Sequence, residues 1–507
     1  MSLLKKYIKS AGYLSARSIV ERLLGMISTV MLARMLGAGP LGIYNAVMNT
    51  ANSAYGIVRL GIDAALHVLT AEATTSEDDA RRKESVWGAS LILLSLCGLA
   101  GSAGCYFFKD WLANIFFKEP ELAKWLQVAS ILVFLQCLSQ FCYTILMGLH
   151  QFAAYAIVSS IVTVGNLVLL SAGLVFYRLP GALAAALITQ ILSLFLIVLI
   201  LRRSLQKIRL KITFRQFTSS VLKIFRFGVP FYAAGLLAIP ATYYLQGLLS
   251  RNWGIETLGY LRIVISFSSL IHFLPTGVAA VSLSTLTRIY SDPKYSSQQF
   301  MEYTLLNIKV TAFFCLTLAM ILVMLLPILI PFLFGGAYLE ALPAARIGVF
   351  TSVFAAIWNC ASHSYFAQKK PIVIFLQSVV QVLALLLLSW FLIPRFGLVG
   401  YVLTDYGGYT AICLSVIGVA TYQAKDLNLN TRSLWGLFGL NVGALSTLWV
   451  LDSLELLEPI KIYIATGIFL SLFLVGYYSL FTSSEKARFA TILSDILKRF
   501  SPPNVCN

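Results

Sequence analysis

The chain has 507 residues, of which 59% are apolar and only 12% are charged. Soluble domains carry roughly 25% charged residues, so this composition excludes a soluble globular enzyme and a disordered chain. The formal net charge of +17 does not indicate nucleic-acid binding, because the Lys and Arg residues punctuate apolar runs instead of gathering on one polar face. The sequence therefore predicts an all-α polytopic membrane protein.

The apolar runs are long enough to cross the bilayer about 14 times. Each run can form a tilted transmembrane helix of roughly 20 residues or more, in which every backbone polar group is hydrogen-bonded within the helix. The expected spans are, in chain order, residues 12–34, 41–68, 86–108, 125–148, 152–177, 180–201, 228–250, 257–286, 303–334, 338–366, 371–393, 396–421, 433–451 and 459–481.

An internal repeat relates the first six expected spans to the next six at a constant offset of 217 positions. The matched residues are Arg34 and Arg251, Gly37 and Gly254, Leu41 and Leu258, Gly42 and Gly259, Gln151 and Gln368, and Arg178 and Arg395. A shared register over separate loops indicates duplication. We expect two parallel six-helix repeats, an N-lobe over residues 1–201 and a C-lobe over 227–421, followed by a C-terminal helix pair within 432–483.

The distribution of basic residues predicts the orientation of the chain in the membrane. If the N-terminus is cytoplasmic, the cytoplasmic segments hold about three times as many Lys and Arg residues as the external ones. We therefore expect both termini in the cytoplasm, with residues 484–507 as a cytoplasmic tail. Residues 202–226 would form a basic cytoplasmic linker, which is either an interfacial helix on anionic lipid or a solvated connection.

Nothing in the sequence predicts metal, cofactor or catalytic chemistry. The eight cysteines and four histidines show no metal-ligand spacing, and no Gly-rich phosphate-binding loop follows a strand pattern. A membrane-bound polymerase or ligase would need a large external catalytic loop, whereas the longest external connection, about Lys109–Lys124, contains no histidine. A scaffold without transport activity would leave the charges inside the spans unexplained.

Charged residues inside the expected spans are the candidate functional residues, because charge is costly in hydrocarbon and by default faces the bundle interior or water. The bases are Arg17, Arg22, Arg59, Arg262, Lys309 and Arg346, and the acids are Glu21, Asp63 and Asp405. The pairs Arg17–Glu21 and Arg59–Asp63 have four-residue spacing, which places each pair on one helix face in the cytoplasmic half of its span.

Two interpretations of these charges are open: a buried ion network that fixes helix packing, or a binding site for an anion. The excess of bases over acids favours an anionic ligand, because purely structural pairs would tend towards neutrality. Lys309 and Arg262 lie nearer span ends, where their side chains can extend to the headgroups. Asp405 can balance Arg346, or it can carry a coupling proton or Na⁺.

Several of these motifs resemble the polysaccharide flippases of the multidrug/oligosaccharidyl-lipid/polysaccharide exporter superfamily. The first turn, from Leu32 through Arg34 and Gly37 to Leu41-Gly42-Ile43-Tyr44, is similar to the run that closes the first hairpin in that family. Phe227–Pro230 resembles the opening of its seventh helix, and Gly259-Tyr260 follows the second turn. Tyr243–Gln246 stands where many members carry an acidic-basic pair.

The resemblance implies a transporter, not an enzyme, that moves an undecaprenyl-diphosphate-linked oligosaccharide from the inner to the outer leaflet of a bacterial plasma membrane. The charges inside the spans fit this cargo, and we expect alternating access in which Arg17, Arg22 and Arg59 capture the diphosphate and pass it towards Arg262 and Arg346. Lys309 belongs to the same candidate set. We expect a monomer that contacts membrane lipids, with an H⁺ or Na⁺ gradient as the energy source and no nucleic acid as a partner.

Two alternatives within the same superfamily remain. A flippase for the lipid-linked peptidoglycan precursor would share the cationic interior. A multidrug or cation antiporter would favour an acidic interior, which the excess of bases counts against.

Overall fold

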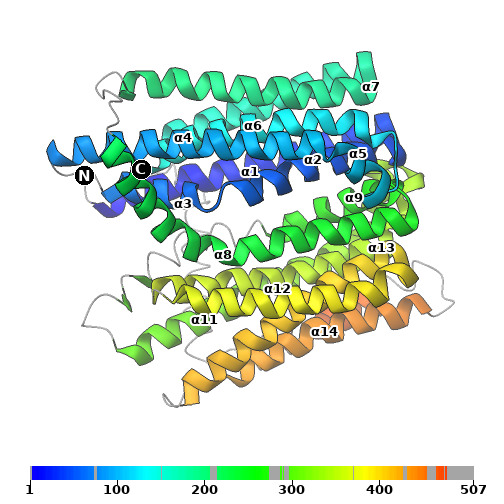
Figure 1. Cartoon of the computed structure of the whole chain (residues 1–507). Helices are drawn as coiled ribbons and strands as arrows, with labels where there is room; N and C mark the ends of the chain where they lie inside the picture. The colour runs from blue at the N-terminus through cyan, green and yellow to red at the C-terminus, as the bar shows by residue number, and fades with distance from the viewer. Residues whose placement is uncertain are drawn as a thin grey trace, which may run out of the picture.

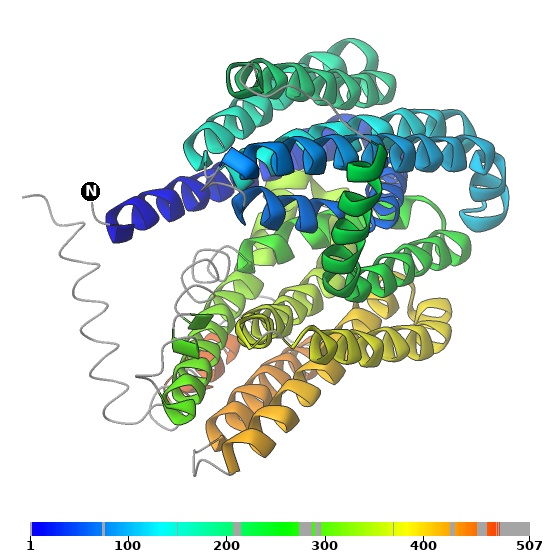
Figure 2. The same cartoon turned by 60° about the vertical axis from the view of Figure 1, so that its left-hand side comes forward.

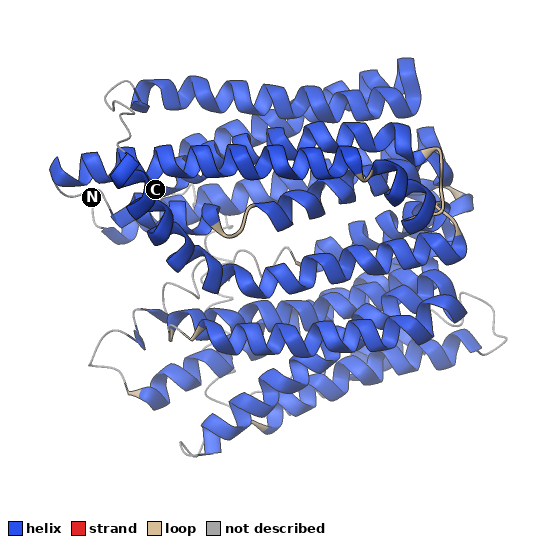
Figure 3. Cartoon of the chain, viewed as in Figure 1, coloured by secondary structure: helices blue, strands red, loops and turns tan. Residues whose placement is uncertain are grey.

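The computed structural model describes residues 3–72, 77–149, 151–205, 214–272, 286–287, 289–290, 296–368, 370–425, 431–453, 464–472, 474 and 476. These residues form helices without any β-strand, which confirms the predicted all-α class (Figure 3). The predicted tail at 484–507 lies outside the described residues, as does most of the last expected span.

The described helices occur in the following chain order. Their bounds are α1 Leu3–Leu36, α2 Ala38–Val58, α3 Ile62–Glu72, α4 Glu77–Phe107, α5 Lys109–Trp111, the π-helix η1 Leu112–Phe116, α6 Leu122–Gly148, α7 Phe152–Leu205, α8 Phe214–Trp253, α9 Glu256–Ile271, α11 Ser297–Phe334, the 3-10 helix η2 Gly336–Ala341, α12 Leu342–Ala367, α13 Pro371–Lys425 and α14 Arg432–Ser453.

Among the described residues, seven helices are long and apolar enough to cross a membrane, which confirms the multi-span prediction. Two of these apolar stretches have 51 and 53 residues. At about 1.5 Å per residue each would be more than twice as long as the ~30 Å hydrocarbon core. Instead, α7 and α13 each reverse direction at a residue whose backbone is not helical. This residue is Arg178 (φ 50°) in α7 and Gly397 (φ 57°) in α13.

The reversal in α7 brings two glycines into contact. A Cβ atom on Gly181 would lie 1.9 Å from the carbonyl oxygen of Gly173, and one on Gly173 would lie 2.4 Å from that of Gly181. Only glycine permits such an approach, because any larger residue would overlap the facing backbone. The α7 hairpin therefore depends on these two positions.

The helices pack side by side as a bundle. Figure 1 shows α1–α7 on one side and α11–α14 on the other, with α8 between them, and the rotated view in Figure 2 agrees. Helix α12 is the most enclosed of the seven apolar helices. In its most apolar stretch 72% of the residues are buried, against 28% in α7 and in α13. Helix α12 is therefore central, whereas α7 and α13 face outward.

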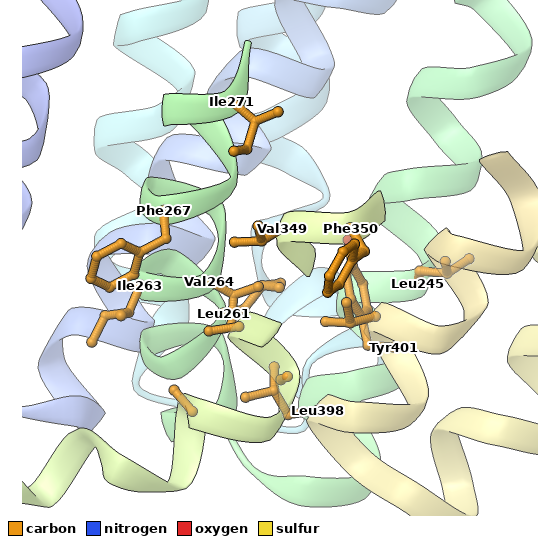
Figure 4. Close-up of a cluster of buried hydrophobic side chains, with 14 of the residues drawn as sticks. Leu245, Leu261, Ile263, Val264, Phe267, Ile271, Val349, Phe350, Leu398 and Tyr401 are labelled. Carbon is orange, nitrogen blue, oxygen red and sulfur yellow. The ribbon is translucent and has the colours of Figure 1, made fainter. Parts of the chain in front are cut away.

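Buried apolar side chains join α8, α9, α12 and α13 (Figure 4). Leu245 comes from α8, Phe267 from α9, Phe350 from α12 and Leu398 from α13, and all are at most 9% exposed. Lipid tails are as apolar as these side chains, so helix association in a membrane relies on close packing rather than on transfer from water.

Helix α8 connects the two sides of the bundle. It begins at Phe214, inside the segment expected to be a linker, and runs without interruption to Trp253. Ile224 belongs to a core cluster otherwise drawn from α3, α4, α6 and α7, and the hydroxyl groups of Ser85 and Ser220 are 2.7 Å apart. The first third of α8 therefore packs on the N-terminal helices, while Leu245, further along α8, packs on the C-terminal ones.

We expect Gly181→Ala to destabilise the protein by about 1–3 kcal/mol, because its methyl group overlaps the Gly173 carbonyl. Thermal unfolding of the purified protein in detergent would show a lowered midpoint. Gly104→Ala is the matched control, because a Cβ there meets nothing within 4 Å. Equal midpoints for the two variants would contradict the hairpin contact.

Candidate functional site

The turn between α1 and α2 packs against the turn between α8 and α9, at what we call the turn end of the bundle. Gly37 (φ 79°) and Gly254 (φ 86°) each allow the chain to reverse. A Cβ on Gly42 would lie 2.0 Å from the Ile255 carbonyl oxygen, and one on Gly259 would lie 2.4 Å from that of Ala38. The two contacts are reciprocal, because Ile255 and Gly259 are the 217-residue repeats of positions 38 and 42.

Polar contacts reinforce the turn end. The Arg34 Nε donates to the Leu333 carbonyl oxygen at 2.7 Å and its Nη2 to that of Phe332 at 2.5 Å. These carbonyls lie at the C-terminus of α11, where the helix dipole favours a cation. The Tyr338 hydroxyl donates to the Ala33 carbonyl oxygen at 2.9 Å. Arg34 thus has a structural role in joining α1 to α11.

Burial changes along α2 from one end to the other. Residues 41–47 near the turn end are all buried, whereas Asn52 and Ile57 are exposed further along the same helix. Helix α2 packs against α4, α6, α7, α8 and α9, so it is enclosed by protein. The bundle is therefore closed at the turn end, and the opposite half of α2 is accessible.

Arg17 and Glu21 form an ion pair on α1 that is bound to α7. The Arg17 Nε lies 2.8 Å from both the Glu21 Oε1 and the Ser159 Oγ, and its Nη1 donates to the Tyr155 hydroxyl at 2.5 Å. Ser159 also donates to Glu21, and the guanidinium lies 4.2 Å from the centre of the Tyr155 ring. The pair keeps 24% and 30% of its side-chain surface exposed, so an anion can approach it.

Arg59 and Asp63 also pair, with 2.7 Å between Nη1 and Oδ2. The expectation that they share one continuous helix over 41–68 is wrong. Helix α2 ends at Val58 and α3 begins at Ile62, because Leu60 (φ 47°) and Gly61 (φ 73°) adopt the left-handed region. The ion pair bridges this break.

Two tyrosines flank the Arg59 guanidinium. The guanidinium carbon lies 5.7 Å from the centre of the Tyr55 ring and 5.2 Å from that of Tyr232, which belongs to α8. Cation–π contacts of this kind hold an arginine without neutralising it. Nearby, Gly61 and Gly228 pack so closely that a Cβ on either would overlap the other's carbonyl oxygen. Arg59 is therefore held between α2 and α8.

Arg22 joins α1 to α9. Its Nη1 donates to the Ser269 carbonyl oxygen, and its Nε lies 3.4 Å from the Ser18 hydroxyl. Arg262, on α9, lies close enough to Tyr44 of α2 to interact electrostatically with it. Its Nε is buried and has no hydrogen-bond partner in the described part of the chain.

The remaining candidates lie in the C-terminal half. Lys309 is only 6% exposed within α11, so it is buried and does not extend to a headgroup. Arg346 lies in the second turn of α12. Asp405 lies on α13 one turn from Tyr401 and one turn from Tyr409. Arg17 and Arg22 thus lie on α1 and Arg59 at the end of α2, whereas Lys309, Arg346 and Asp405 lie on α11, α12 and α13.

Sequence reasoning missed the uncharged partners of the arginines. Tyr155 and Ser159 come from a helix more than 100 positions away, so no local pattern indicates them. A polar stripe on α2 was detectable, however. Asn45, Asn49, Asn52 and Arg59 recur at spacings of four, three and seven, which places them on one helix face.

The long apolar helices and the charges between them together define a multi-span membrane protein. In agreement with the resemblance seen in the sequence, residues 7–290 match the family described as polysaccharide biosynthesis protein. The chain belongs to this family. No curated protein sequence matched the chain.

Solved structures of the MOP superfamily share the fold. The lipid II flippase MurJ in an inward closed conformation gives a TM-score of 0.69 with 19% identity, covering 91% of this chain and 97% of that one. An inward-facing multidrug resistance MATE family transporter gives a TM-score of 0.63 with 16% identity, covering 80% of this chain and 95% of that one. A MOP superfamily transporter from Pyrococcus furiosus, described as having a binding pocket of reverse polarity, gives a TM-score of 0.52 with 16% identity, covering 83% of this chain and 97% of that one.

We expect Gly42→Ala to loosen the turn end, because its methyl group overlaps the Ile255 carbonyl. Asn45 is 1% exposed there and donates to the Leu258 carbonyl oxygen at 2.9 Å. In a background without native cysteines, maleimide labelling of Asn45→Cys should become several-fold faster when Gly42→Ala is added.

Gly39→Ala is the control, since its Cβ would meet Glu256 at an ordinary 3.7 Å. Unchanged labelling with Gly42→Ala would show that the turn contact does not close this end.

Proposed function

We propose that the protein is a flippase that moves an undecaprenyl-diphosphate-linked oligosaccharide from the inner to the outer leaflet of a bacterial plasma membrane, for surface polysaccharide biosynthesis. The observation that carries this proposal is the placement of Arg17, Arg22 and Arg59 in the half of the bundle that is accessible. Membership of the polysaccharide biosynthesis protein family supports a lipid-linked saccharide as the cargo.

The proposal includes the finer topology. Fourteen spans would be arranged as an N-lobe at 1–201, a C-lobe at 227–421 and a final pair within 432–483, with both termini cytoplasmic. The turn end would then face outward and the accessible half of α2 would face the cytoplasm. The lobes would rock about each other, which is the usual form of alternating access in transporters built from repeats.

Charge balance favours an anionic headgroup. Arg17, Arg22 and Arg59 stand against only Glu21 and Asp63, so the N-terminal group carries a net positive charge. A diphosphate has several acceptor oxygens, which arginine can bind through two parallel N–H groups. The attraction is stronger in a partly enclosed site than in bulk water. The headgroup would contact the remaining bases later on its route: Arg262, Lys309 and Arg346. Alternatively, these bases would balance the charge of acids such as Asp405.

The energy source in this proposal is an ion gradient. Asp405 is the candidate carrier of a coupling proton or Na⁺, because it is an acid within α13 in the C-lobe. Glu21 and Asp63 would instead balance the arginines while the cargo is absent. We propose that a monomer is sufficient for transport.

A second candidate function is a flippase for the lipid-linked peptidoglycan precursor. The fold similarity to the lipid II flippase MurJ, at a TM-score of 0.69, favours it. Both candidates move a diphosphate lipid and require the same arginines. A cation antiporter fits less well, because cationic substrates would be repelled by this group.

We expect reconstituted protein to transfer a labelled diphosphate-linked oligosaccharide between leaflets, and Arg59→Ala to slow the transfer at least tenfold. Hydrogen bonds to charged groups contribute roughly 1.5–3 kcal/mol, which corresponds to about 10- to 150-fold. Lys124→Ala is the control, because Lys124 has 58% of its side-chain surface exposed and lies at the predicted external face.

Undiminished transfer by Arg59→Ala and Arg22→Ala would overturn the site while leaving the fold intact. Transfer of lipid-linked peptidoglycan precursor alone would favour the second candidate, and transport of cations alone would overturn the flippase.

A further inference from the structure

Uncharged amide side chains occupy the middle of the accessible region, between the arginines and the turn end. Asn52 on α2 is exposed, and its Oδ1 accepts a hydrogen bond from the Gln136 Nε2 of α6 at 3.1 Å. Asn49, one turn nearer the turn end, donates to the Gln246 Oε1 of α8 at 2.8 Å and is half-buried. The second pair joins the two halves of the bundle.

Asn52 is exposed and Gln136 is half-buried, and their depth in the bundle is unusual for side-chain amides that are not fully buried. Each lies 14 residues from the turn-end start of its helix, at Ala38 in α2 and Leu122 in α6, which corresponds to about 21 Å. That distance is near the middle of the span. A polar side chain there is costly against lipid and normally faces protein or water. Helix α2 packs against α4, α6, α7, α8 and α9, so the exposed Asn52 lies on a helix that is largely surrounded by protein.

The pair also has unused hydrogen-bonding capacity. The Gln136 Oε1 is buried without a hydrogen-bond partner in the described residues. Asn52 uses its Oδ1, while its exposed amide retains donor groups. A ligand rich in hydroxyl or acetamido groups supplies both donors and acceptors, which a lipid tail or a bare phosphate does not.

We propose that Asn52 and Gln136 form a glycan-binding subsite that takes the sugars nearest the diphosphate of the cargo. This inference rests on the proposed function and deepens it. Asn52 lies seven residues, or about 10 Å along the helix axis, from Arg59 in the direction of the turn end. A headgroup held by Arg59 would therefore place its first sugars beside the amide pair, while the polyprenyl tail remains in the bilayer.

A subsite of this kind selects by hydrogen bonding. A site built to bind hydroxyl groups discriminates strongly against a ligand that lacks them, because its polar groups are then left unpaired. The arginines would give affinity for any diphosphate lipid, whereas the amide pair would give preference for the glycosylated form.

The experiment measures binding of two probes to the purified protein: undecaprenyl diphosphate and the same lipid carrying an oligosaccharide. We expect wild type to bind the glycosylated probe more tightly. Asn52→Ala combined with Gln136→Ala should weaken that binding about tenfold and leave binding of the bare diphosphate within twofold. If the double variant does not fold, the milder Asn52→Ser replaces it. This variant should also reduce the preference for the glycosylated probe.

Asn441→Ala is the matched control. Asn441 is also an interhelical amide, fully buried between α12, α13 and α14, where it accepts from Tyr406 at 3.0 Å and donates to the Phe350 carbonyl oxygen at 3.4 Å. Its loss should lower stability without changing the preference between the probes.

The outcomes separate the two hypotheses. If wild type binds both diphosphate lipids equally, or if the amide variants weaken both equally, the glycan subsite is overturned while the flippase proposal stands. If wild type binds neither probe, the proposed function fails and the subsite fails with it.

Discussion

The approach of two backbone turns at one end of the bundle is the constraint on which the site depends. Gly42 and Gly259 each meet a carbonyl oxygen of the opposite turn at a distance that a side chain would prevent. Residues 41–47 of α2 are all buried next to this reciprocal contact, and the exposed Asn52 and Ile57 lie in the other half of the helix. Asn52 and Arg59 are in that half. Closure at one end thus determines the end from which a ligand can reach the arginines.

Ring faces and hydroxyl groups stabilise Arg17 and Arg59 in addition to their carboxylate partners. Arg17 shares Glu21 with Ser159 and lies over Tyr155, and Arg59 has one carboxylate and two flanking rings. Tyrosine hydroxyls and ring faces lower the cost of a partly buried cation while leaving its charge available. Such an arrangement keeps the protein folded when empty and still attracts a diphosphate. Arg17, Arg22 and Arg59 outnumber the carboxylates Glu21 and Asp63, so the five side chains together keep one excess positive charge.

Sequence patterns predicted the all-α class, the paired turns and the acidic partners of Arg17 and Arg59, because those features depend on composition, repetition and local spacing. The break at Leu60 was not predictable from the four-residue spacing of Arg59 and Asp63, which is compatible with a continuous helix. The contacts of Tyr155 and Tyr232 depend on tertiary packing across many residues. The asparagine stripe on α2 is visible in the sequence, but a prediction based on charged residues alone does not include neutral amides. The topology of the two lobes stays a prediction.

The central claim is that the accessible arginines bind a lipid by its negative headgroup. Native mass spectrometry of the purified protein, with undecaprenyl diphosphate competing against undecaprenol of the same chain length, tests it most directly. The account predicts retention of the diphosphate lipid over the neutral alcohol, and loss of that preference when Arg17, Arg22 and Arg59 are replaced together by glutamine. Equal retention of the two lipids by wild type, or an undiminished preference in the triple variant, would contradict the account.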